Sequence, residues 1–497
     1  PLLTLDLISP DEGPLYDEAF TRGSITPSPL NRHTVSNLFY DSLALSVWKQ
    51  AGPTRWALRV NPSSGNLHPT EGYLVCGPIE GLCETPMICH YAPAEHGLEV
   101  RAEISSATWN EINAGLPKGA ILVGLTSIHW REVWKYGERA YRYCQLDAGH
   151  AIAAVAIAAS GLGWQAALLD GIGSEQLTNL LGISDPQSAE AEHPDCLLAI
   201  YPNSERLNRF TLAEAVTDTF RTLSWRGSPN QLSPSHQEWE IIDNVAEAAQ
   251  KPRTEGEYER SPQQAGEITA DQGALPLRQI IHQRRSAQAM DGQTAISRDA
   301  FYSILEHCIA RAEQIPFTTL PWEPSVHMAL FVHRVTGLEP GLYLLVRNAE
   351  QEEVLRSEMN PKFLWEQIEG APPGIGLYLL AAGDLRSLAR DLSCNQDIAS
   401  DGCFTVAMIS NFEEPLTHLG PWFYPRLYWE CGMIGQMLYL EAEAAGVRGT
   451  GIGCFFDDPV HEVLGLKTER YRSLYHFTVG KPIEDSRLTT LPPYPAR

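Results

Sequence analysis

Residues 121–150 have the sequence ILVGLTSIHWREVWKYGERAYRYCQLDAGH, and a related segment, FTVAMISNFEEPLTHLGPWFYPRLYWECGM, follows at residues 404–433. The two align without a gap at an offset of 404 − 121 = 283 residues. Four pairs of glycines coincide at this offset: Gly137 with Gly420, Gly149 with Gly432, Gly163 with Gly446, and Gly182 with Gly465. Each copy has the pattern of a strand, a loop, a long apolar helix, a Gly-rich turn and a short helix. The chain is therefore predicted to contain one fold twice.

The similarity extends toward the start of each copy with a different spacing. Residues 87–101, MICHYAPAEHGLEVR, match GLYLLVRNAEQEEVLR, which begins at residue 341, at an offset of 341 − 87 = 254 residues. The change of 283 − 254 = 29 residues predicts an insertion in the second copy, which we place around Met359 to Ser400.

A linker is predicted between the two copies. The segment Ser224 to Pro276 is rich in Ser, Pro, Gln and Glu, and a helix is expected within it near Gln237 to Gln250. The predicted domains are residues 1–223, the linker at 224–276, and residues 277–497. Two copies of a fold on one chain are typical of an obligate dimer that has been fused.

The composition is that of an ordinary globular chain, with 43% hydrophobic and 20% charged residues. The formal net charge is 37 − 61 = −24, which disfavours binding to nucleic acid or to an anionic membrane surface. The most apolar stretch, Ala151 to Leu162, is too short to span a bilayer. A ligand that carries phosphate would therefore need a local basic pocket.

Ten cysteines are present, and no two of them are spaced as a CxxC pair. Zinc ribbons and thioredoxin-like redox sites are accordingly disfavoured, and no metal site is predicted. Because no secretory signal segment is visible in the sequence, we expect reduced thiols and a cytoplasmic location. No GxSxG, HExxH or P-loop motif supports a serine hydrolase, a zincin or an NTPase.

The first candidate binding element is the turn PSSGN, which comprises Pro62, Ser63, Ser64, Gly65 and Asn66. Its small hydroxyls, its amide and its backbone NH groups suit the edge of a planar heterocycle that offers alternating donors and acceptors. A plain ST-turn before a strand is the alternative interpretation.

The second element is Arg284-Arg285-Ser286, which follows the predicted helical start PLRQIIHQ. Adjacent arginines and a hydroxyl can bind a phosphate through charge-assisted hydrogen bonds. A solvated basic pair without a ligand is the alternative.

The third element is GTGIGCFFDD at residues 449–458, with Gly451, Gly453 and Cys454 at its centre. Its glycines would let backbone amides approach a flat ligand closely. It is not a GxGxxG fingerprint between a strand and a helix, which disfavours a Rossmann dinucleotide site. A helix C-cap followed by a turn is the alternative.

Together the three elements resemble the nitroreductase superfamily. Its pattern has RxS near the start, PSSxNxxP one element later, a Gly-containing turn after the central helix, and a basic residue near the end. The resemblance implies an α+β fold in which each half is a mixed or antiparallel sheet flanked by helices, so that the two halves form an intramolecular pseudo-dimer. In this family FMN binds at the dimer interface, with RxS and the Gly-containing turn from one subunit and PSSxN from the other.

The resemblance also implies that the second copy has lost half of its site. At the offset of 254 residues Pro62 aligns with Pro316, but the polar residues of the turn align with Phe317, Thr318 and Leu320. Conversely, the first copy offers only Arg32-His33-Thr34 where the second has its RRS triplet.

One complete site is therefore expected, with one FMN per chain. It would combine the PSSGN turn of the first half with the RRS triplet, the GIGCF segment and Arg487 of the second half. Gln288 stands where the family pattern has a further basic group, which weakens the expected phosphate clamp.

The first half resembles the SagB-type dehydrogenases in particular, through the segment KYGERAYRY at residues 135–143 and the GH pair that follows it. This implies that Lys135 and Tyr136 are catalytic proton-transfer groups, on the loop before the central helix. A solvated lysine and a packed tyrosine are the alternative. The second copy has His418 and Leu419 at these positions, consistent with a single active centre.

The resemblance implies an FMN-dependent dehydrogenase or oxidase that transfers hydride between the flavin and a heterocyclic or peptide-derived substrate. An NAD(P)H-dependent reductase of the nitroreductase type is one alternative, with NAD(P)H as electron donor. A non-catalytic flavin-binding scaffold in a biosynthetic complex is the other. Nothing in the sequence names the substrate.

Overall fold

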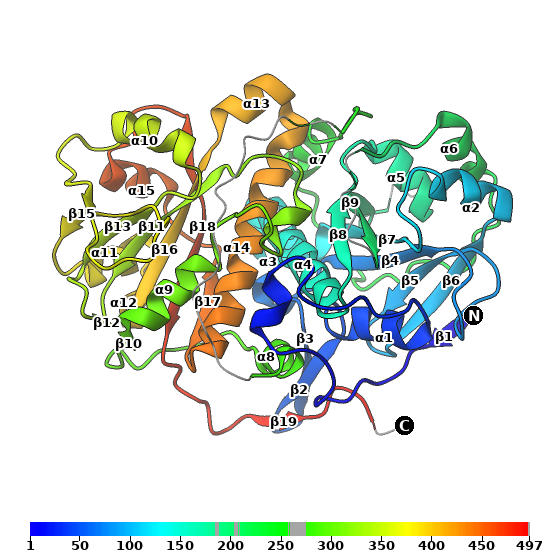
Figure 1. The fold of residues 1–497 in the computed structure, drawn as a ribbon, viewed down its shortest axis with the longest axis horizontal. Coiled ribbons are helices and arrows are strands. Elements are labelled where there is room, and N and C mark those ends of the chain that lie inside the picture. Colours follow the sequence, from blue (N-terminus) through cyan, green and yellow to red (C-terminus); the bar gives the residue numbers. More distant parts are fainter. Residues whose placement is uncertain (184–187, 203–206, 208, 257, 259–274, 496–497) are drawn as a thin grey trace.

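The computed structural model describes residues 1–183, 188–202, 207, 209–256, 258 and 275–495. Two halves lie side by side along the longest axis of the molecule, and the colours from blue to red pass from one half to the other (Figure 1). Each half contains one seven-stranded sheet among its described residues. The predicted tandem α+β fold is thereby confirmed.

The sheet of the first half has the strand order β1-β6-β5-β4-β7-β9-β8, and all neighbouring strands are antiparallel. Its strands are β1 (Leu2–Thr4), β4 (Thr70–Cys76), β5 (Met87–Ala92), β6 (Gly97–Glu103), β7 (Ile121–Ile128), β8 (Gln165–Leu168) and β9 (Glu192–Tyr201).

The sheet of the second half repeats this arrangement in the order β14-β15-β13-β11-β16-β18-β17, again antiparallel throughout. Its strands are β11 (Val326–Val332), β13 (Gly341–Leu345), β14 (Glu366–Gln367), β15 (Leu377–Ala382), β16 (Phe404–Asn411), β17 (Arg448–Ile452) and β18 (Tyr471–Gly480). The central strands β7 and β16 even share a register shift, at Leu125/Thr126 and at Met408/Ile409. These positions are 408 − 125 = 283 residues apart, which is the spacing of the sequence repeat.

Helices flank both sheets. In the first half and the linker they are α1 (Arg32–Tyr40), α2 (Ser106–Asn113), α3 (Trp130–Tyr136), α4 (Ala140–Gly161), α5 (Ser174–Leu181), α6 (Glu214–Arg221) and α7 (Glu240–Ala248). In the second half they are α8 (Leu277–Gln283), α9 (Arg298–Glu306), α10 (Glu352–Glu358), α11 (Arg386–Leu392), α12 (Ile398–Asp401), α13 (Glu413–Leu419), α14 (Tyr424–Ala444) and α15 (Asp457–Leu464).

The two halves meet where the long helices α4 and α14 pack against each other at the centre of the molecule (Figure 1). Helix α4 is apolar on almost every side, as expected for a helix enclosed by protein. The backbones touch at two glycines that the repeat makes equivalent. A Cβ atom on Gly149 would lie within 3.0 Å of the backbone of Trp429, and one on Gly432 would lie within 3.0 Å of the backbone of Leu146. Only glycine permits this separation of the two helices.

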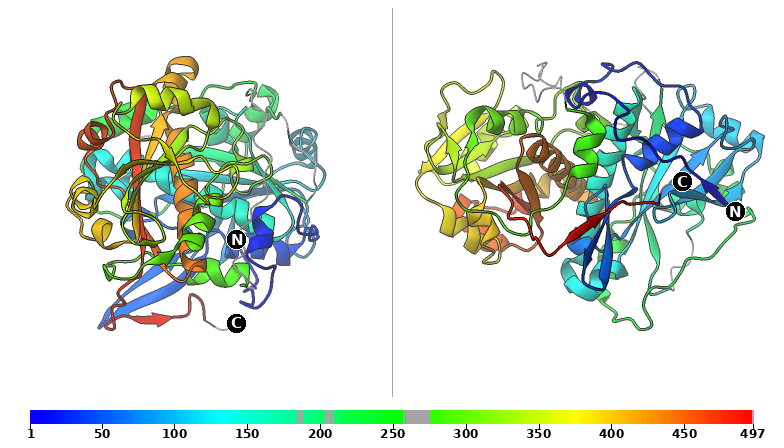
Figure 2. Two further views of the ribbon diagram at one scale, coloured as in Figure 1. Left: turned by 60° about the vertical axis from the view of Figure 1, so that its left-hand side comes forward. Right: turned by 90° about the horizontal axis from the view of Figure 1, so that it is seen from below.

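The C-terminal segment of the second half returns to the first half. Strand β19 (Thr489–Leu491) pairs with β2 (Leu45–Ala51), which forms a hairpin with β3 (Thr54–Arg59). Figure 2 shows this red segment running beside the blue hairpin when the molecule is seen from below. The Tyr494 hydroxyl accepts a hydrogen bond from the Leu45 amide (2.9 Å) and donates one to the Pro93 carbonyl (2.7 Å).

The structure defines the bounds of the linker helix and of the insertion more narrowly than the sequence does. Helix α7 lies within the predicted helical stretch, whereas residues 257 and 259–274 of the linker lie outside the described residues. The insertion lies between β13 and β15, at residues 346–376, because only residues 93–96 join the equivalent strands β5 and β6. The predicted range of 359–400 begins too late and includes α11, which corresponds in position to α2.

The expectation of reduced thiols is wrong for two of the ten cysteines. Cys394 and Cys454 form a disulfide, and the other eight cysteines are free. The two half-cystines are 60 residues apart and come from different elements, with their Cα atoms 5.9 Å apart in the folded chain. Spacing along the sequence could not reveal this pair. Within the described residues, no helix combines the length and apolar character needed to cross a membrane.

The contact between the central helices can be tested by whether an alanine at Gly432 raises or lowers the free energy of unfolding. On helix propensity alone, Gly432→Ala should raise the free energy of unfolding by about 1 kcal/mol. Because the new methyl group would collide with the backbone of α4, we expect a loss of about 1–3 kcal/mol in chemical denaturation instead. Ala444→Gly, at the end of α14, serves as the control for helix propensity. A stabilised Gly432→Ala variant would contradict the close approach of the helices.

Candidate functional site

A cavity of about 530 Å³ lies between the two halves. The first half lines it with the PSSGN turn, Tyr136, Tyr143 and Asp147, and the second half lines it with the RRS triplet, Arg448 and residues 450–454. Three segments that are far apart in the sequence are thus brought together, as the sequence analysis predicts.

The PSSGN turn is a short 3-10 helix at Ser64–Asn66 with left-handed backbone at Gly65 and Asn66. Some of its polar groups hold the turn itself: Ser63 Oγ accepts from the His68 amide (2.8 Å), and Asn66 Nδ2 donates to the Ala57 carbonyl (2.9 Å). The ST-turn interpretation therefore describes the internal bonding of the segment, while the same five residues line the cavity.

The RRS triplet follows α8 and crosses to the first half. The Arg284 guanidinium donates to the carbonyls of Arg59 (3.1 Å) and Val60 (3.2 Å) and lies 4.9 Å from the Tyr439 ring centre. Its buried Nε atom has no hydrogen-bond partner among the described residues. A buried donor without a partner is costly, so this atom is suited to receive an acceptor from a ligand.

A second group of cations at the cavity was not found by sequence reasoning. Lys49 on β2 and Arg448 on β17 line the cavity with Arg285. Burial, and then the positive charges of Arg285 and Arg448, lower the pKa of Lys49. Glu484 also lines the cavity and pairs with Arg448 (2.6 Å), which balances part of this positive charge. The repulsion that remains among the three cations would be relieved by a bound anion. No motif marks Lys49 or Arg448, because each stands alone in its strand.

Arg487 does not belong to this group, which corrects its assignment as a cofactor-binding residue. Its side chain is 84% exposed and pairs with Asp485 (2.8 Å). Gln288, by contrast, lines the cavity as the family pattern would place it.

Gly451 and Gly453 are glycines for a steric reason. A Cβ atom on Gly451 would lie within 3.0 Å of the Tyr475 side chain, and one on Gly453 would lie within 3.0 Å of the Tyr143 ring. Gly451 lies in strand β17, well after the end of α14. The alternative interpretation as a helix C-cap is therefore wrong, and Cys454 follows directly at the rim of the cavity.

Lys135 and Tyr136 form the last turn of helix α3, and not a loop as predicted. Both approach the PSSGN turn: a Cβ atom on Gly65 would lie within 3.0 Å of the Lys135 ammonium and of the Tyr136 hydroxyl. Burial, and then the nearby Glu132 carboxyl, raise the pKa of Tyr136 to about 12. The pair thus lies beside the turn of the first half, and Tyr136 also lines the cavity, whereas Lys135 is exposed.

Two buried carboxyl groups lie behind this pair. Asp147 on α4 accepts hydrogen bonds from the Ser64 amide (3.0 Å) and the Ser64 hydroxyl (3.0 Å). Burial raises the pKa of Asp147 to about 7, and burial together with the Asp147 charge raises the pKa of Glu132 to about 10. A charged residue within an apolar helix was the only sequence signal for Asp147.

The family model for nitroreductases matches residues 50–200 and 281–481, which is one match in each half. The chain belongs to the nitroreductase family. Similar solved structures include a candidate nitroreductase from Anabaena variabilis, with 19% identity, a TM-score of 0.68, and coverage of 97% of this chain and 94% of that one. This likeness extends the fold over both halves. No match was found among curated proteins.

Two further structures resemble only part of the chain. A candidate nitroreductase from Ralstonia eutropha is 15% identical, covers 45% of this chain and 90% of that one, and has a TM-score of 0.30. The E. coli microcin synthetase McbBCD complex with truncated pro-MccB17 bound is 17% identical over 41% of this chain and 75% of that one, with a TM-score of 0.29.

The repeat gives the interface a second, equivalent position, where side chains leave a cavity of only about 30 Å³ beside Arg426. Asp170 and Arg426, which the repeat places opposite Gly453 and Tyr143, form a buried ion pair (2.6 Å). The Tyr258 hydroxyl of the linker donates to Asp170 as well. Aromatic rings surround this pair: Trp322, Trp422, Phe423 and Trp429.

The segment of the first half that corresponds to the RRS triplet also needs correction. Arg32 is the first residue of helix α1, and α1 is the counterpart of α9 in the order of elements. The Arg32 side chain forms an ion pair with Asp6 (3.0 Å). The equivalent segment is instead at Thr21–Arg22, where the Arg22 amide donates to the Glu313 carbonyl (3.0 Å). The alignment missed this because the spacing changes between the two copies.

The raised pKa of Asp147 predicts a pH dependence of stability. The folded state keeps this proton up to about pH 7, whereas the unfolded chain releases it near its ordinary value of 3.8. The free energy of unfolding should therefore fall as the pH rises from 5 to 8, by about 2 kcal/mol for this group. Asp147→Asn should remove that part of the slope in urea denaturation at the two pH values. Asp458→Asn, which changes an exposed carboxyl on α15, is the matched control, and an unchanged slope in Asp147→Asn would refute the assignment.

Proposed function

We propose that the chain is an FMN-dependent oxidoreductase of the SagB-type dehydrogenase branch, with one active centre between its halves. The observation that carries the proposal is the cavity of about 530 Å³ at the interface, where the PSSGN turn, the cation group and the glycine turn meet beside Lys135 and Tyr136. The family supports flavin chemistry, and the SagB-type segment of the first half supports the branch.

The residues of the cavity fit FMN. The unpartnered Nε atom of Arg284 offers a hydrogen-bond donor, and Gly451 and Gly453 leave room where other residues would place a side chain. Lys49, Arg285 and Arg448 supply the positive charge that a terminal phosphate needs in a chain with a net charge of −24. The absence of a dinucleotide fingerprint favours FMN over FAD.

When bound, FMN would supply the hydride chemistry, and the protein would bind and orient the substrate and supply or remove its proton. Tyr136 holds its proton firmly, because its pKa is raised, and can donate it or return it through a hydrogen bond. The Lys135 ammonium, next to the same glycine of the PSSGN turn, is placed to stabilise negative charge on the reacting group. Asp147 orients the turn through Ser64.

The substrate is proposed to be a heterocyclic or peptide-derived molecule in a cytoplasmic setting, which the eight free cysteines suit. We keep the domain limits at residues 1–223 and 277–497, joined by the linker at 224–276.

An NAD(P)H-dependent reductase would share the cofactor and differ in its electron donor. Anaerobic bleaching of the bound flavin by NADPH favours the reductase, and bleaching only by an oxidisable substrate favours the dehydrogenase. In a non-catalytic scaffold, neither NADPH nor an oxidisable substrate would bleach the flavin.

The first test is the identity and amount of the cofactor. We expect the purified protein to be yellow and to release one FMN per chain after denaturation, because the second interface position is filled by the Arg426–Asp170 pair. Chromatography of the released flavin and a protein assay on the same sample give both results. Release of FAD, or of two FMN per chain, would overturn the proposal for the site.

A second test separates the cation group from Arg487. Arg285→Ala and Arg448→Ala should each weaken FMN retention by about 1.5–3 kcal/mol, since each removes a charge-assisted phosphate contact. Arg487→Ala is the matched control and should retain FMN like the wild type, because its side chain points into solvent. Equal retention after dialysis in all three variants would refute the phosphate site.

The third test separates binding from chemistry. Lys135→Ala and Tyr136→Phe should keep FMN, since both leave the cation group and the PSSGN turn unchanged, but should lose about 10²–10⁴-fold in flavin reduction by a panel of reduced heterocyclic peptides or by NADPH. Trp134→Ala, on the exposed side of the same helix turn, is the control. Wild-type rates in both variants would show that the pair has no catalytic role.

A further inference from the structure

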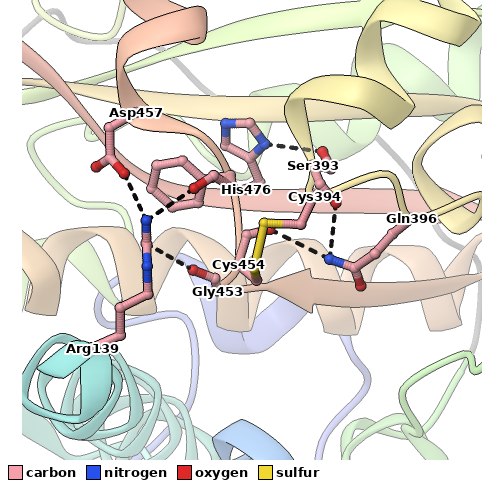
Figure 3. The surroundings of a disulfide bond; sticks show 9 residues. Arg139, Ser393, Cys394, Gln396, Gly453, Cys454, Asp457 and His476 are labelled. Carbon is pink, nitrogen blue, oxygen red and sulfur yellow. Dashed lines mark hydrogen bonds and ion pairs between the residues drawn. A yellow bond between two sulfur atoms is a disulfide. The ribbon is translucent and has the colours of Figure 1, made fainter. Parts of the chain in front are cut away.

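The disulfide lies at the rim of the proposed flavin cavity. Cys394 belongs to the loop between α11 and α12, and Cys454 follows Gly453 after strand β17. Figure 3 shows the two sulfur atoms between Gln396 and the glycine turn. Both Cys454 and Gln396 line the cavity, so the sulfur bridge adjoins the segment that would face the flavin.

The disulfide differs from the other cysteines in its access to solvent. Cys454 is exposed and Cys394 is half-buried, whereas seven of the eight free cysteines are buried. Disulfides that stabilise a fold resist reduction, and exposed ones are the more easily reduced. An exposed disulfide beside a redox cofactor site can therefore exchange electrons, while the buried thiols cannot.

Hydrogen bonds keep the two segments together without the sulfur bridge. The Gln396 amide donates to the Cys454 carbonyl (3.3 Å) and to the Ser393 carbonyl (2.9 Å) (Figure 3). The Phe456 amide donates to the Leu392 carbonyl (2.9 Å). On the far side, Ser393 is held by the His476 ring, with 3.1 Å between Oγ and Nδ1. Breaking the S–S bond would thus leave both sulfurs close enough to form it again.

We propose that the Cys394–Cys454 disulfide is a second redox site, which accepts two electrons from the reduced flavin. This inference rests on the proposed function, because that function supplies the flavin. In the step, the S–S bond breaks, both sulfurs become thiols, and the flavin returns to its oxidised form. The disulfide gains the two electrons and two protons that the reduced flavin loses. A soluble disulfide could then reoxidise the pair by thiol–disulfide exchange.

Reductive titration of the FMN-loaded protein tests the inference. With dithionite under anaerobic conditions, the wild type should take up four electrons per FMN, whereas Cys394→Ser and Cys454→Ser should take up two. Thiol counts after denaturation should rise from eight to ten in the wild type, since two of the ten cysteines begin as a disulfide. Cys83→Ser, which removes a half-buried free cysteine, is the matched control and should still take up four electrons.

The same titration of protein stripped of FMN shows the route of the electrons. If they pass through the flavin, the stripped protein should keep eight reactive thiols under identical treatment. Uptake of two electrons per FMN by the wild type, ten thiols before reduction, or equal thiol formation without FMN would each overturn the inference. Protein that binds no flavin would contradict the proposed function itself, which is a separate outcome.

Discussion

The contact between α4 and α14 at Gly149 and Gly432 is the constraint on which the rest of the structure depends. Without Cβ atoms at these two positions, the helix backbones reach a separation that no other residue would permit. Each helix leads on one side to its own sheet and on the other to the turn that follows it. Asp147 on α4 holds the PSSGN turn through Ser64, and α14 leads into β17 and the glycine turn. The distance between the helices therefore affects the distance between these two turns.

The two equivalent interface positions differ: one holds a large cavity, and the other holds a buried ion pair. In the complete site, Gly453 faces the ring of Tyr143, and an opening remains between the halves. At the equivalent place, the side chains of Asp170 and Arg426 point toward each other and form an ion pair. A buried ion pair is stable only when both partners are present and well hydrogen-bonded. This pair has both partners, a further hydrogen bond from Tyr258 and a wall of aromatic rings.

The carboxylates on the central helices follow the same logic. Asp147 and Glu430 occupy equivalent positions of the repeat. Glu430 is buried against Arg347, which balances its charge. Asp147 has no such cation beside it, and burial raises its pKa to about 7 although Ser63 and Ser64 donate hydrogen bonds to it. The half of the interface with the large cavity is thus the half in which the buried carboxyl has no cation as partner.

Much of the fold could be predicted from the sequence, because glycines at a fixed spacing record a backbone geometry that both copies share. The cavity residues on turns could be found for a similar reason, since PSSGN and the glycine turn have local shapes that only certain residues adopt. Lys49, Arg448 and the Cys394–Cys454 pair could not, because their roles arise from partners far away in the sequence. Arg487 and Arg32 could not be assigned correctly, because a basic residue at the right spacing looks the same in the sequence whether it faces a ligand or water.

The return of β19 to the hairpin of the first half, together with the single chain, has a consequence for how the site responds to dilution. In a dimer of separate subunits, a shared cofactor site exists only at protein concentrations at which the subunits associate. Here each half finds the other at an effective concentration fixed by the chain itself. The affinity of the site for its ligand should thus be the same in a cell with a few copies of the protein as in a concentrated solution.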